Sequence, residues 1–376
     1  MDFIDLKAQY KHLKSEIDAG IAEVLSHAQF IMGPEVSLFE RGLASFSGVK
    51  HCISCANGTD ALQLIYMAYG IGPGDAVFCP DITFIATIEP ACMLGATPIF
   101  CDITPDTYNI CPESLERQIN AVISEGQLTP KAVVPVDFLG NPADYNELSG
   151  ICKKHGLLLI EDAAQSIGAT YRGKACGGFG DSAITSFFPA KPLGCYGDGG
   201  AVLTNDDSIA EICESLRVHG KGPLGKYHNV RIGINSRLDT LQAAILLPKL
   251  KALGEYETAS RQTVADRYNE AFSGYFTTPY IEPGNQSIYA QYALLAADKT
   301  QRDAVLDRLK KAGIPSMIYY PAPLHTLDVF KHTHNYSEKF TNSQDYCSRT
   351  FSLPMHPYLT AESQDRVVYC VTREEI

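Results

Sequence analysis

A repeated alternation of short apolar runs with amphipathic segments between residues 51 and 160 restricts the fold of this chain more than any other feature. The run Leu157-Leu158-Leu159-Ile160 is apolar at every position, which is typical of a strand covered by helices on both faces. Strands that alternate with helices form parallel sheets through crossover connections. We therefore predict an α/β fold with a mostly parallel sheet between helical layers. The predicted strands are 51–56, 77–79, 98–101, 133–136, 157–160 and 183–188, and the predicted helices are 15–31, 61–68, 85–94, 112–124 and 145–155.

The C-terminal part of the chain has a different pattern, in which helices predominate and prolines separate short segments. We expect a long helix over 255–272, an alternating strand near 289–295 and a further helix over 302–311. This pattern predicts a large α/β domain over residues 1–240 and a smaller α+β domain over residues 241–376. The N-terminal helix is a candidate to pack against the small domain.

Composition and charge exclude several classes of function. The formal net charge is −12, and the lysines and arginines are scattered without a basic block. Such a distribution argues against binding to nucleic acid or to an anionic membrane surface. No segment approaches the roughly 18 to 20 apolar residues of a membrane span, and the N-terminal residues lack the pattern of a signal peptide. We therefore expect a cytoplasmic protein.

The chain contains 12 cysteines, most of them within apolar runs. In a cytoplasmic protein such thiols are predicted to be reduced and to pack in the core. Cys52 and Cys55 form a C-x-x-C pair, which could also be redox-active or half of a metal site. Because there is no second pair and this one lies in a predicted strand, we favour core packing. A metal hydrolase and a Rossmann nucleotide binder are not predicted either, since clustered His and Asp ligands and a G-x-G-x-x-G motif are both missing.

A lysine between two prolines follows one of the predicted strands. Residues 183–188 are apolar and aromatic, Pro189 ends the strand, and Lys191 precedes Pro192 and a glycine-rich segment. A lysine in a loop is ordinarily a solvated charge. In a partly desolvated site, however, a lysine has a lowered pKa and becomes a nucleophile for carbonyl groups. We favour the reactive amine, because two other stretches supply what a carbonyl cofactor needs.

These two stretches also follow predicted strands, where open parallel sheets bind their ligands. In Asn57-Gly58-Thr59-Asp60, the glycine allows close approach and the helix N-terminus would hold a phosphate, although the same residues also suit an ordinary helix cap. Ser186 could reach the same phosphate. Asp162 could pair with a protonated ring nitrogen, and a helix cap or a structural ion pair is the alternative. Together with Lys191, these groups predict pyridoxal 5′-phosphate (PLP) as the cofactor.

Longer motifs are spread over the chain, and they include Asp5-Leu6-Lys7-Ala8-Gln9-Tyr10, Gly58-Thr59-Asp60-Ala61-Leu62, Gly72-Pro73-Gly74-Asp75, residues 80–84, residues 161–165, the Lys191 loop, Tyr320-Pro321-Ala322-Pro323-Leu324-His325 and Leu353-Pro354-Met355-His356-Pro357. Through these motifs nearly the whole chain resembles the DegT/DnrJ/EryC1/StrS aminotransferases. These are PLP-dependent enzymes of fold type I that act on nucleotide-linked keto sugars. The resemblance implies a large domain with a mostly parallel sheet and a smaller C-terminal α+β domain.

The resemblance also implies roles for individual residues. Lys191 would form the internal aldimine with PLP and later move the proton. Asp162 would pair with the pyridine nitrogen and Gln165 would hydrogen-bond the phenolic oxygen. Phe84 would stack on the ring, and an ordinary core aromatic is the competing interpretation. The residues expected around the phosphate are Gly58, Thr59, Asp60 and Ser186, with Asn235 contributed across the interface of an obligate homodimer.

The implied reaction is transamination of a nucleotide keto sugar with L-glutamate as amino donor. The chain keeps Lys191, where a related group of sugar dehydratases has histidine. Residues 235–242 and the Lys191 loop are similar to the branch that aminates the 3-position of UDP-2-acetamido-2-deoxy-3-oxo-D-glucuronate, for surface polysaccharides such as the O-antigen of lipopolysaccharide. The alternatives are a dTDP-3-keto-6-deoxyhexose, a 4-keto nucleotide sugar, or a non-catalytic PLP-binding regulator.

Five residues are expected to bind the substrate. Arg237 could pair bidentately with a sugar carboxylate, although arginine also occurs here where the sugar is neutral. Lys221 lies in the basic loop 219–227, for which a plain solvated loop is the competing interpretation. Tyr319 replaces a histidine that is frequent in the family. The remaining two are Tyr320 and His325.

Overall fold

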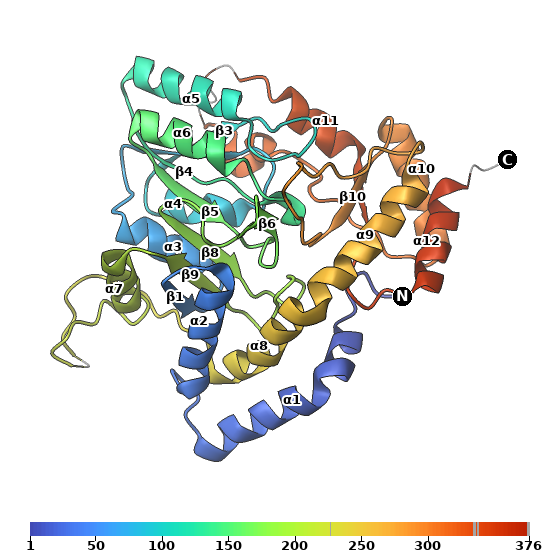
Figure 1. The fold of residues 1–376 in the computed structure, drawn as a ribbon. Coiled ribbons are helices and arrows are strands. Elements are labelled where there is room, and N and C mark those ends of the chain that lie inside the picture. The colour runs from blue at the N-terminus through green and yellow to red at the C-terminus, as the bar shows by residue number, and fades with distance from the viewer. Residues whose placement is uncertain (226, 334–335, 337, 374–376) are drawn as a thin grey trace.

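A seven-stranded sheet forms the centre of the computed structural model, which describes residues 1–373 except 226, 334, 335 and 337 (Figure 1). The strand order is β1-β9-β8-β5-β4-β2-β3, and within this sheet β9 alone runs antiparallel to its neighbours. The predicted mostly parallel α/β sheet is therefore confirmed. The strands are β1 (His51–Cys55), β2 (Asp75–Pro80), β3 (Thr97–Cys101), β4 (Thr129–Val133), β5 (Leu158–Asp162), β8 (Ser182–Ser186) and β9 (Gly200–Thr204), and a separate hairpin is formed by β6 (Thr170–Tyr171) and β7 (Lys174–Ala175).

Helices cover both faces of this sheet, because successive side chains of a strand point to opposite sides. On β2, Val77 and Cys79 belong to one core cluster, whereas Ala76 and Phe78 belong to another. Burial on both faces explains why the strands are continuous apolar runs. The first cluster includes α3 (Gly58–Ala68), α4 (Glu89–Met93) and α7 (Asp207–Leu216), the second includes α5 (Pro112–Glu125) and α6 (Tyr145–His155), and a third includes α2 (Pro34–Ser47) and α8 (Thr240–Ala252).

Two of the predicted helices differ from the structure by more than a few residues or are divided in it. Helix α1 covers Leu6–His27 instead of 15–31, because the Asp5 carboxylate accepts a hydrogen bond from the Ala8 N–H at 2.8 Å and caps an earlier start. It ends where Ala28 adopts a left-handed φ of 56°. The predicted helix 85–94 is divided into a 3₁₀ turn and α4. Pro90, in the first turn of α4, has no N–H for a continuous helical ladder.

Some strand bounds also differ from the prediction. Strand β4 ends at Val133, where the predicted strand began. Its first half contains polar residues and a proline, so it has no apolar run from which a strand could be predicted. Strand β8 ends at Ser186, and the aromatic side chain of Phe188 is 53% exposed beyond it. The predicted alternating strand near 289–295 is β10 (Tyr292–Leu295). All four of its side chains are buried, so its burial does not alternate.

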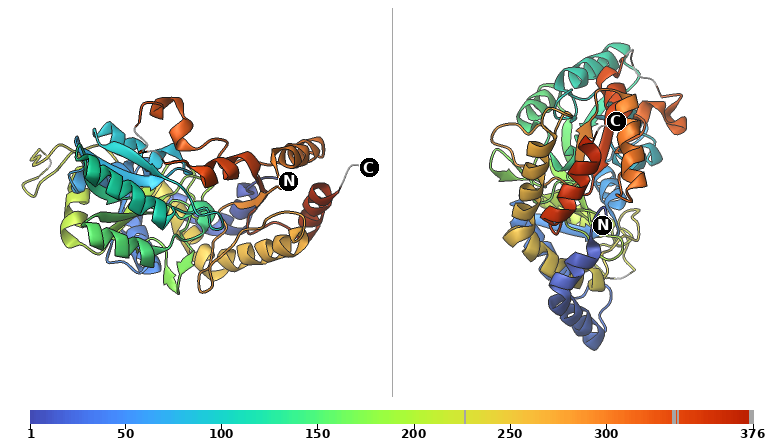
Figure 2. Two further views of the ribbon diagram at one scale, coloured as in Figure 1. Left: turned by 90° about the horizontal axis from the view of Figure 1, so that it is seen from above. Right: turned by 90° about the vertical axis from the view of Figure 1, so that its right-hand side faces the viewer.

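The C-terminal part of the chain forms a separate hydrophobic core, and its helices lie together at one end of the molecule (Figure 2). Helix α8 continues through a π-helical turn, Leu253–Glu257, into α9. A two-stranded antiparallel sheet and two further helices complete this core. Its elements are α9 (Thr258–Phe272), β10, α10 (Lys299–Lys311), β11 (Thr350–Leu353) and α12 (Ala361–Thr372), and α11 (Thr341–Arg349) lies in a neighbouring cluster.

The N-terminal helix contacts both parts of the molecule. Leu13 and Ile17 of α1 pack against Ile245 of α8, and the ring of His12 on α1 lies 4.6 Å from the ring of Tyr358, between the centroids. The predicted domain boundary at residue 240 coincides with the first residue of α8. It stays a prediction, because α8 and α9 form one uninterrupted helical stretch.

Within the described ranges, no helix has both the length and the hydropathy to span a bilayer. All 12 cysteines are free thiols, and both Cys52 and Cys55 are buried in β1.

Candidate active site

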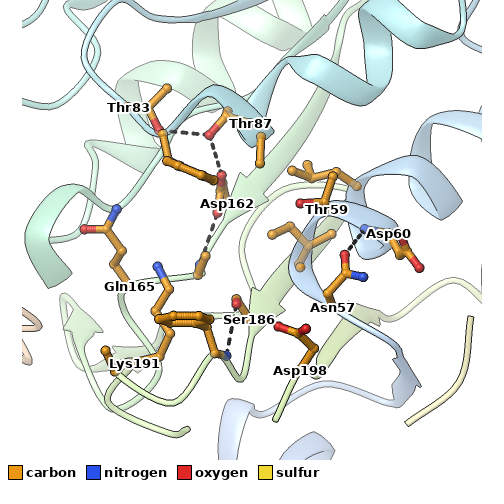
Figure 3. Close-up of a pocket in the computed structure, with 18 of the residues that line it drawn as sticks. Asn57, Thr59, Asp60, Thr83, Thr87, Asp162, Gln165, Ser186, Lys191 and Asp198 are labelled. Carbon is orange, nitrogen blue, oxygen red and sulfur yellow. Dashed lines mark hydrogen bonds between the residues drawn. The ribbon is translucent and has the colours of Figure 1, made fainter. Parts of the chain in front are cut away.

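A cavity of about 650 Å³ lies at the carboxyl ends of β5 and β8, beside the first turn of α3 (Figure 3). Ligand sites of parallel α/β sheets are expected at this edge. The sheet brings together here segments that are far apart in the sequence. The predicted site residues that line the cavity are Gly58, Thr59, Asp60, Phe84, Asp162, Gln165, Ser186, Lys191, Tyr319 and Tyr320.

One end of the cavity is formed by the N-terminus of α3. The Asn57 side chain accepts a hydrogen bond from the Asp60 N–H at 2.8 Å, and α3 begins at Gly58. A Cβ at Gly58 would lie 2.8 Å from the Cβ of Ser186, so glycine is needed for this close approach. The hydroxyls of Thr59 and Ser186 and the N–H groups of the first helical turn, apart from that of Asp60, therefore share one small region. That combination suits a phosphate.

Asp162 occupies the last position of β5 and is buried. Its carboxylate accepts hydrogen bonds from the Thr87 hydroxyl at 2.8 Å and from the Ala164 N–H at 3.1 Å. Burial raises the pKa of Asp162, while these hydrogen bonds and the charge of Lys191 act in the opposite direction. Such a carboxylate is stabilised by a bound cation, and a protonated ring nitrogen is one.

Thr87 is itself oriented by a second hydroxyl. Its Oγ1 lies 2.8 Å from Oγ1 of Thr83, and both threonines line the cavity. The sequence analysis missed both. The signal that could have found them is their spacing of four residues directly after β2, because the carboxyl end of a parallel strand is where polar side chains converge.

Lys191 extends its side chain into the cavity toward Asp162 and Gln165 (Figure 3). A turn holds its backbone, because the Lys191 N–H donates to the carbonyl of Phe188 at 2.8 Å. Burial lowers the pKa of Lys191, and the charge of Asp162 opposes that shift only in part. A larger fraction of the amine is therefore neutral than in a solvated lysine, and a neutral amine can attack a carbonyl carbon.

Gln165 is oriented by the backbone. Its side-chain oxygen accepts a hydrogen bond from the Leu139 N–H at 2.9 Å, which leaves the NH₂ group to donate into the cavity. The next residue, Ser166, donates its hydroxyl hydrogen to the buried carboxylate of Asp137 at 2.6 Å. Asp137 also accepts from the hydroxyl of Tyr145 at 2.6 Å. Asp137 therefore fixes the turn that carries Gln165, and its role was not predicted from the sequence.

Aromatic side chains also line the cavity. Phe84 is 57% exposed, and its ring centroid lies 6.4 Å from that of Tyr320. Because an exposed phenylalanine at a cavity is poorly explained by core packing, the ring-stacking interpretation gains support over the competing one. Gln291 and Asp198 also line the cavity. Neither was predicted, since no local sequence pattern distinguishes them.

Four predicted site residues do not line the cavity in this single chain. Asn235 is exposed and Arg237 half-buried, both just before α8, and Lys221 is exposed in the loop after α7. His325 instead binds the buried carboxylate of Asp81, with its Nδ1 at 2.6 Å from Oδ2. The roles of these four residues stay predictions. Lys226, in the same basic loop as Lys221, lies outside the described residues.

Comparison with known proteins places this cavity in context. The family model of the DegT/DnrJ/EryC1/StrS aminotransferase family matches residues 11–372. The chain is 47% identical over 366 residues to a Pseudomonas aeruginosa protein named UDP-2-acetamido-2-deoxy-3-oxo-D-glucuronate aminotransferase, a match that covers 96% of this chain and 97% of that protein. It is 42% identical over 369 residues to the pleiotropic regulatory protein of Geobacillus stearothermophilus, covering 97% of this chain and 96% of that one.

A solved structure has the same fold throughout. The crystal structure of a DegT DnrJ EryC1 StrS aminotransferase from Brucella abortus matches with a TM-score of 0.96 and 48% identity, and the match covers 99% of this chain and 98% of that one. The family model, the two relatives and this structure thus match the chain over nearly its full length. The chain belongs to the DegT/DnrJ/EryC1/StrS aminotransferase family.

Proposed function

We propose that this protein is a PLP-dependent aminotransferase that transfers an amino group from L-glutamate to a nucleotide-linked keto sugar. The observation that carries the proposal is the convergence of Lys191, Asp162 and the N-terminus of α3 on one cavity. An amine, a carboxylate and a phosphate site in this arrangement match the aldehyde, ring nitrogen and phosphate of PLP. When bound, PLP would supply an electron sink that makes the Cα–H bond of an amino donor acidic.

The residues in the cavity fit this cofactor. Gly58, Thr59 and Ser186 would hold the phosphate at the positive end of the α3 dipole. Asp162, fixed by Thr87, would keep the ring nitrogen protonated. Gln165, whose oxygen is occupied by the Leu139 N–H, would donate from its nitrogen to the phenolic oxygen. Phe84 would cover one face of the ring.

Lys191 would have two roles. Its Nζ would first bind the cofactor covalently, which requires the neutral amine that burial favours. Once the amino donor has displaced it, the same Nζ would accept the Cα proton as a general base and return it at the 4′ carbon of the cofactor. Removal of the amino group in one half-reaction and its addition in the other would take place in the same cavity. This order predicts ping-pong kinetics.

The substrate we propose is UDP-2-acetamido-2-deoxy-3-oxo-D-glucuronate, with amination at the 3-position. The support is the 47% identity to a protein with that substrate in its name. Tyr319 and Tyr320 line the cavity and would contact the sugar. Arg237 would bind its carboxylate, and Lys221 and His325 are the other proposed contacts. The role of the product in surface polysaccharide synthesis stays a prediction.

We further propose that the active form is a homodimer in which Asn235 of one subunit completes the phosphate site of the other. The loop between α7 and α8 extends away from the sheet (Figure 1). It exposes apolar side chains, with Leu224 81% and Ile232 88% exposed, and Asn235 lies three residues after Ile232. Large apolar side chains on a projecting loop suit a partner surface.

The free thiols of all 12 cysteines suit a cytoplasmic location, which we also propose.

The test is to load the protein with PLP, reduce it with borohydride and locate the cofactor by mass spectrometry. We expect the added mass on Lys191 and no added mass in Lys191→Ala. Label on another lysine, or on none, would refute the proposal.

A second measurement then separates an enzyme from a PLP-binding regulator, which the 42% identity to a regulatory protein keeps as the other candidate. Protein first treated with glutamate is mixed with a panel of nucleotide keto sugars. A catalyst will regain the visible absorbance of PLP with one of them, whereas a regulator will regain it with none.

A further inference from the structure

A buried lysine on α8 supports the loop that carries Lys191. Lys249 is 1% exposed, its Nζ donates a hydrogen bond to the carbonyl of Gly194 at 2.6 Å, and the same Nζ lies 4.0 Å from the centre of the Tyr196 ring. Burial lowers the pKa of Lys249 to about 8, so Lys249 is still protonated in most molecules at neutral pH. A buried ammonium ordinarily pairs with a carboxylate. This one is directed at a carbonyl and a ring face of the Lys191 loop.

Gln242 holds the same loop from one face of α8. Its side-chain oxygen accepts a hydrogen bond from the Tyr196 N–H at 2.8 Å, and its nitrogen lies 3.4 Å from the Tyr196 carbonyl oxygen. Gln242 and Lys249 are seven residues apart, which is about two helical turns, so they project from the same side of the helix. A Cβ at Gly197 would lie 3.2 Å from the Gln242 nitrogen, so the loop backbone fits closely against this helix.

Contacts within the loop connect the residues bound by Lys249 and Gln242 to Lys191. It folds back so tightly that a Cβ at Gly194 would lie 2.4 Å from the carbonyl oxygen of Pro189. The Cys195 N–H donates to the carbonyl of Phe187 at 2.8 Å. Residues on both sides of Lys191 are therefore in direct contact, and fixing the position of Gly194 also fixes the turn that carries Lys191.

We propose that Lys249 is a positioning residue for Lys191: by holding the Gly194 carbonyl, together with Gln242 at Tyr196, it fixes the reactive amine in its place at the cavity. This inference rests on the proposed function of Lys191. Lys249 does not line the cavity, so it acts through the loop and does not touch the substrate. A displacement of about 1 Å at a reacting group costs on the order of 100-fold in rate.

The test uses Lys249→Met, which keeps a side chain of similar length and removes the donor. Lys251→Met is the matched control, because Lys251 is on the same helix with a side chain that is 59% exposed. The first readout is hydrogen exchange in the cofactor-free protein. We expect faster exchange in residues 189–200 of Lys249→Met, with exchange in the strands of the sheet beyond this loop unchanged, and no change in Lys251→Met.

The second readout is the half-reaction of the PLP-loaded variant with L-glutamate. We expect kcat to fall about 10- to 100-fold while KM changes less than about threefold, because binding contacts stay and only the amine is displaced. Gln242→Leu, at a half-buried position, is the second variant if Lys249→Met does not fold. It should loosen the same loop and lower kcat in the same direction.

Two results would overturn the inference. One is wild-type exchange in residues 189–200 together with a wild-type kcat. The other is faster exchange spread evenly over the sheet with kcat and KM affected alike, which indicates a general loss of stability. Failure of the proposed function itself would appear separately, as wild-type protein in which hydride reduction does not attach PLP to Lys191.

Discussion

Replacing Asp162 by asparagine tests whether its charge, beyond its hydrogen bonds, serves the reaction. Asparagine has nearly the same shape, and its side-chain oxygen can still accept from the Thr87 hydroxyl, as the carboxylate does at 2.8 Å. The charge is lost, together with the hydrogen bond from the Ala164 N–H at 3.1 Å, because an amide offers one oxygen where the carboxylate has two. A carboxylate and a ring cation about 4 Å apart in an effective dielectric of about 20 interact by about 4 kcal/mol. That energy corresponds to about three pKa units of the ring nitrogen and about a 1,000-fold change in rate.

The assay is a single turnover of the PLP-loaded variant with L-glutamate, followed by the loss of visible absorbance. We expect full cofactor occupancy and a rate constant about three orders of magnitude below wild type. The control is Asp206→Asn, which neutralises a carboxylate that caps α7 and does not line the cavity. A rate constant for Asp162→Asn within about tenfold of wild type, at full occupancy, would refute the electrostatic argument.

The cofactor-free variant offers a second measurement with the opposite sign. The charge of Asp162 raises the pKa of Lys191, which burial lowers. Without that charge the pKa of Lys191 falls further, and more of the amine is neutral at pH 7. Reductive methylation of Lys191 should therefore be faster in Asp162→Asn than in wild type, while transamination is slower. Equal labelling rates would show that the two side chains are not electrostatically coupled.

Three further predictions concern the support of the site and the stability of the fold. Gly200→Ala would place a Cβ 2.4 Å from the backbone of Asn57. We therefore expect the free energy of unfolding, measured with denaturant, to fall by about 1–3 kcal/mol, and PLP titration to show weaker binding. Unchanged values would contradict the close approach of the two backbones. The Arg217 guanidinium lies 2.6 Å from the Glu40 carboxylate, and both side chains are mostly buried. Arg217→Met leaves that carboxylate unpaired, so we expect the free energy of unfolding to fall by about 3–5 kcal/mol and to recover in part when Glu40→Gln is added. A fall below about 1 kcal/mol would contradict this expectation. Burial lowers the pKa of His356 to about 4 from an ordinary 6.5, so the unfolded chain binds more protons below pH 6.5 and folded stability is lost as pH falls. Relative to His356→Gln, wild type should lose about 2 kcal/mol between pH 7 and pH 5, and parallel stability curves for the two proteins would refute this.

Elements with strong local signals could be predicted from the sequence. Helix α6 was predicted with its observed bounds, because Asp144 caps its start and Gly156 ends it in the left-handed conformation. Helix 85–94 failed because one proline divides it. Strand β4 was displaced because its first half is only partly buried, and so has no apolar run. Burial patterns predict a strand well only where both of its faces are covered.

The residues of the candidate site also fall into two groups, those that a local sequence pattern identifies and those that it does not. Asn57, Asp162 and Lys191 could be identified because each lies within a few residues of a strand end, and the end of a parallel strand is a place that sequence order alone defines. Thr87, which holds Asp162, is 75 residues away from it in the chain. Leu139, whose N–H orients Gln165, is 26 residues away. No local pattern marks such partners.

By itself, the sequence determined most of the order of strands and helices, and it predicted a cofactor class and the residues that would hold it, because these depend on hydrophobic periodicity and on motifs only a few residues long. The tertiary structure alone decided how those residues are oriented. The Thr87 hydroxyl on Asp162, the Leu139 N–H on Gln165 and the grip of Lys249 on the Lys191 loop all join segments that meet only when the sheet is assembled. Side-chain orientation depends on packing and hydrogen bonds across the core, and these involve residues that the chain brings together only after folding.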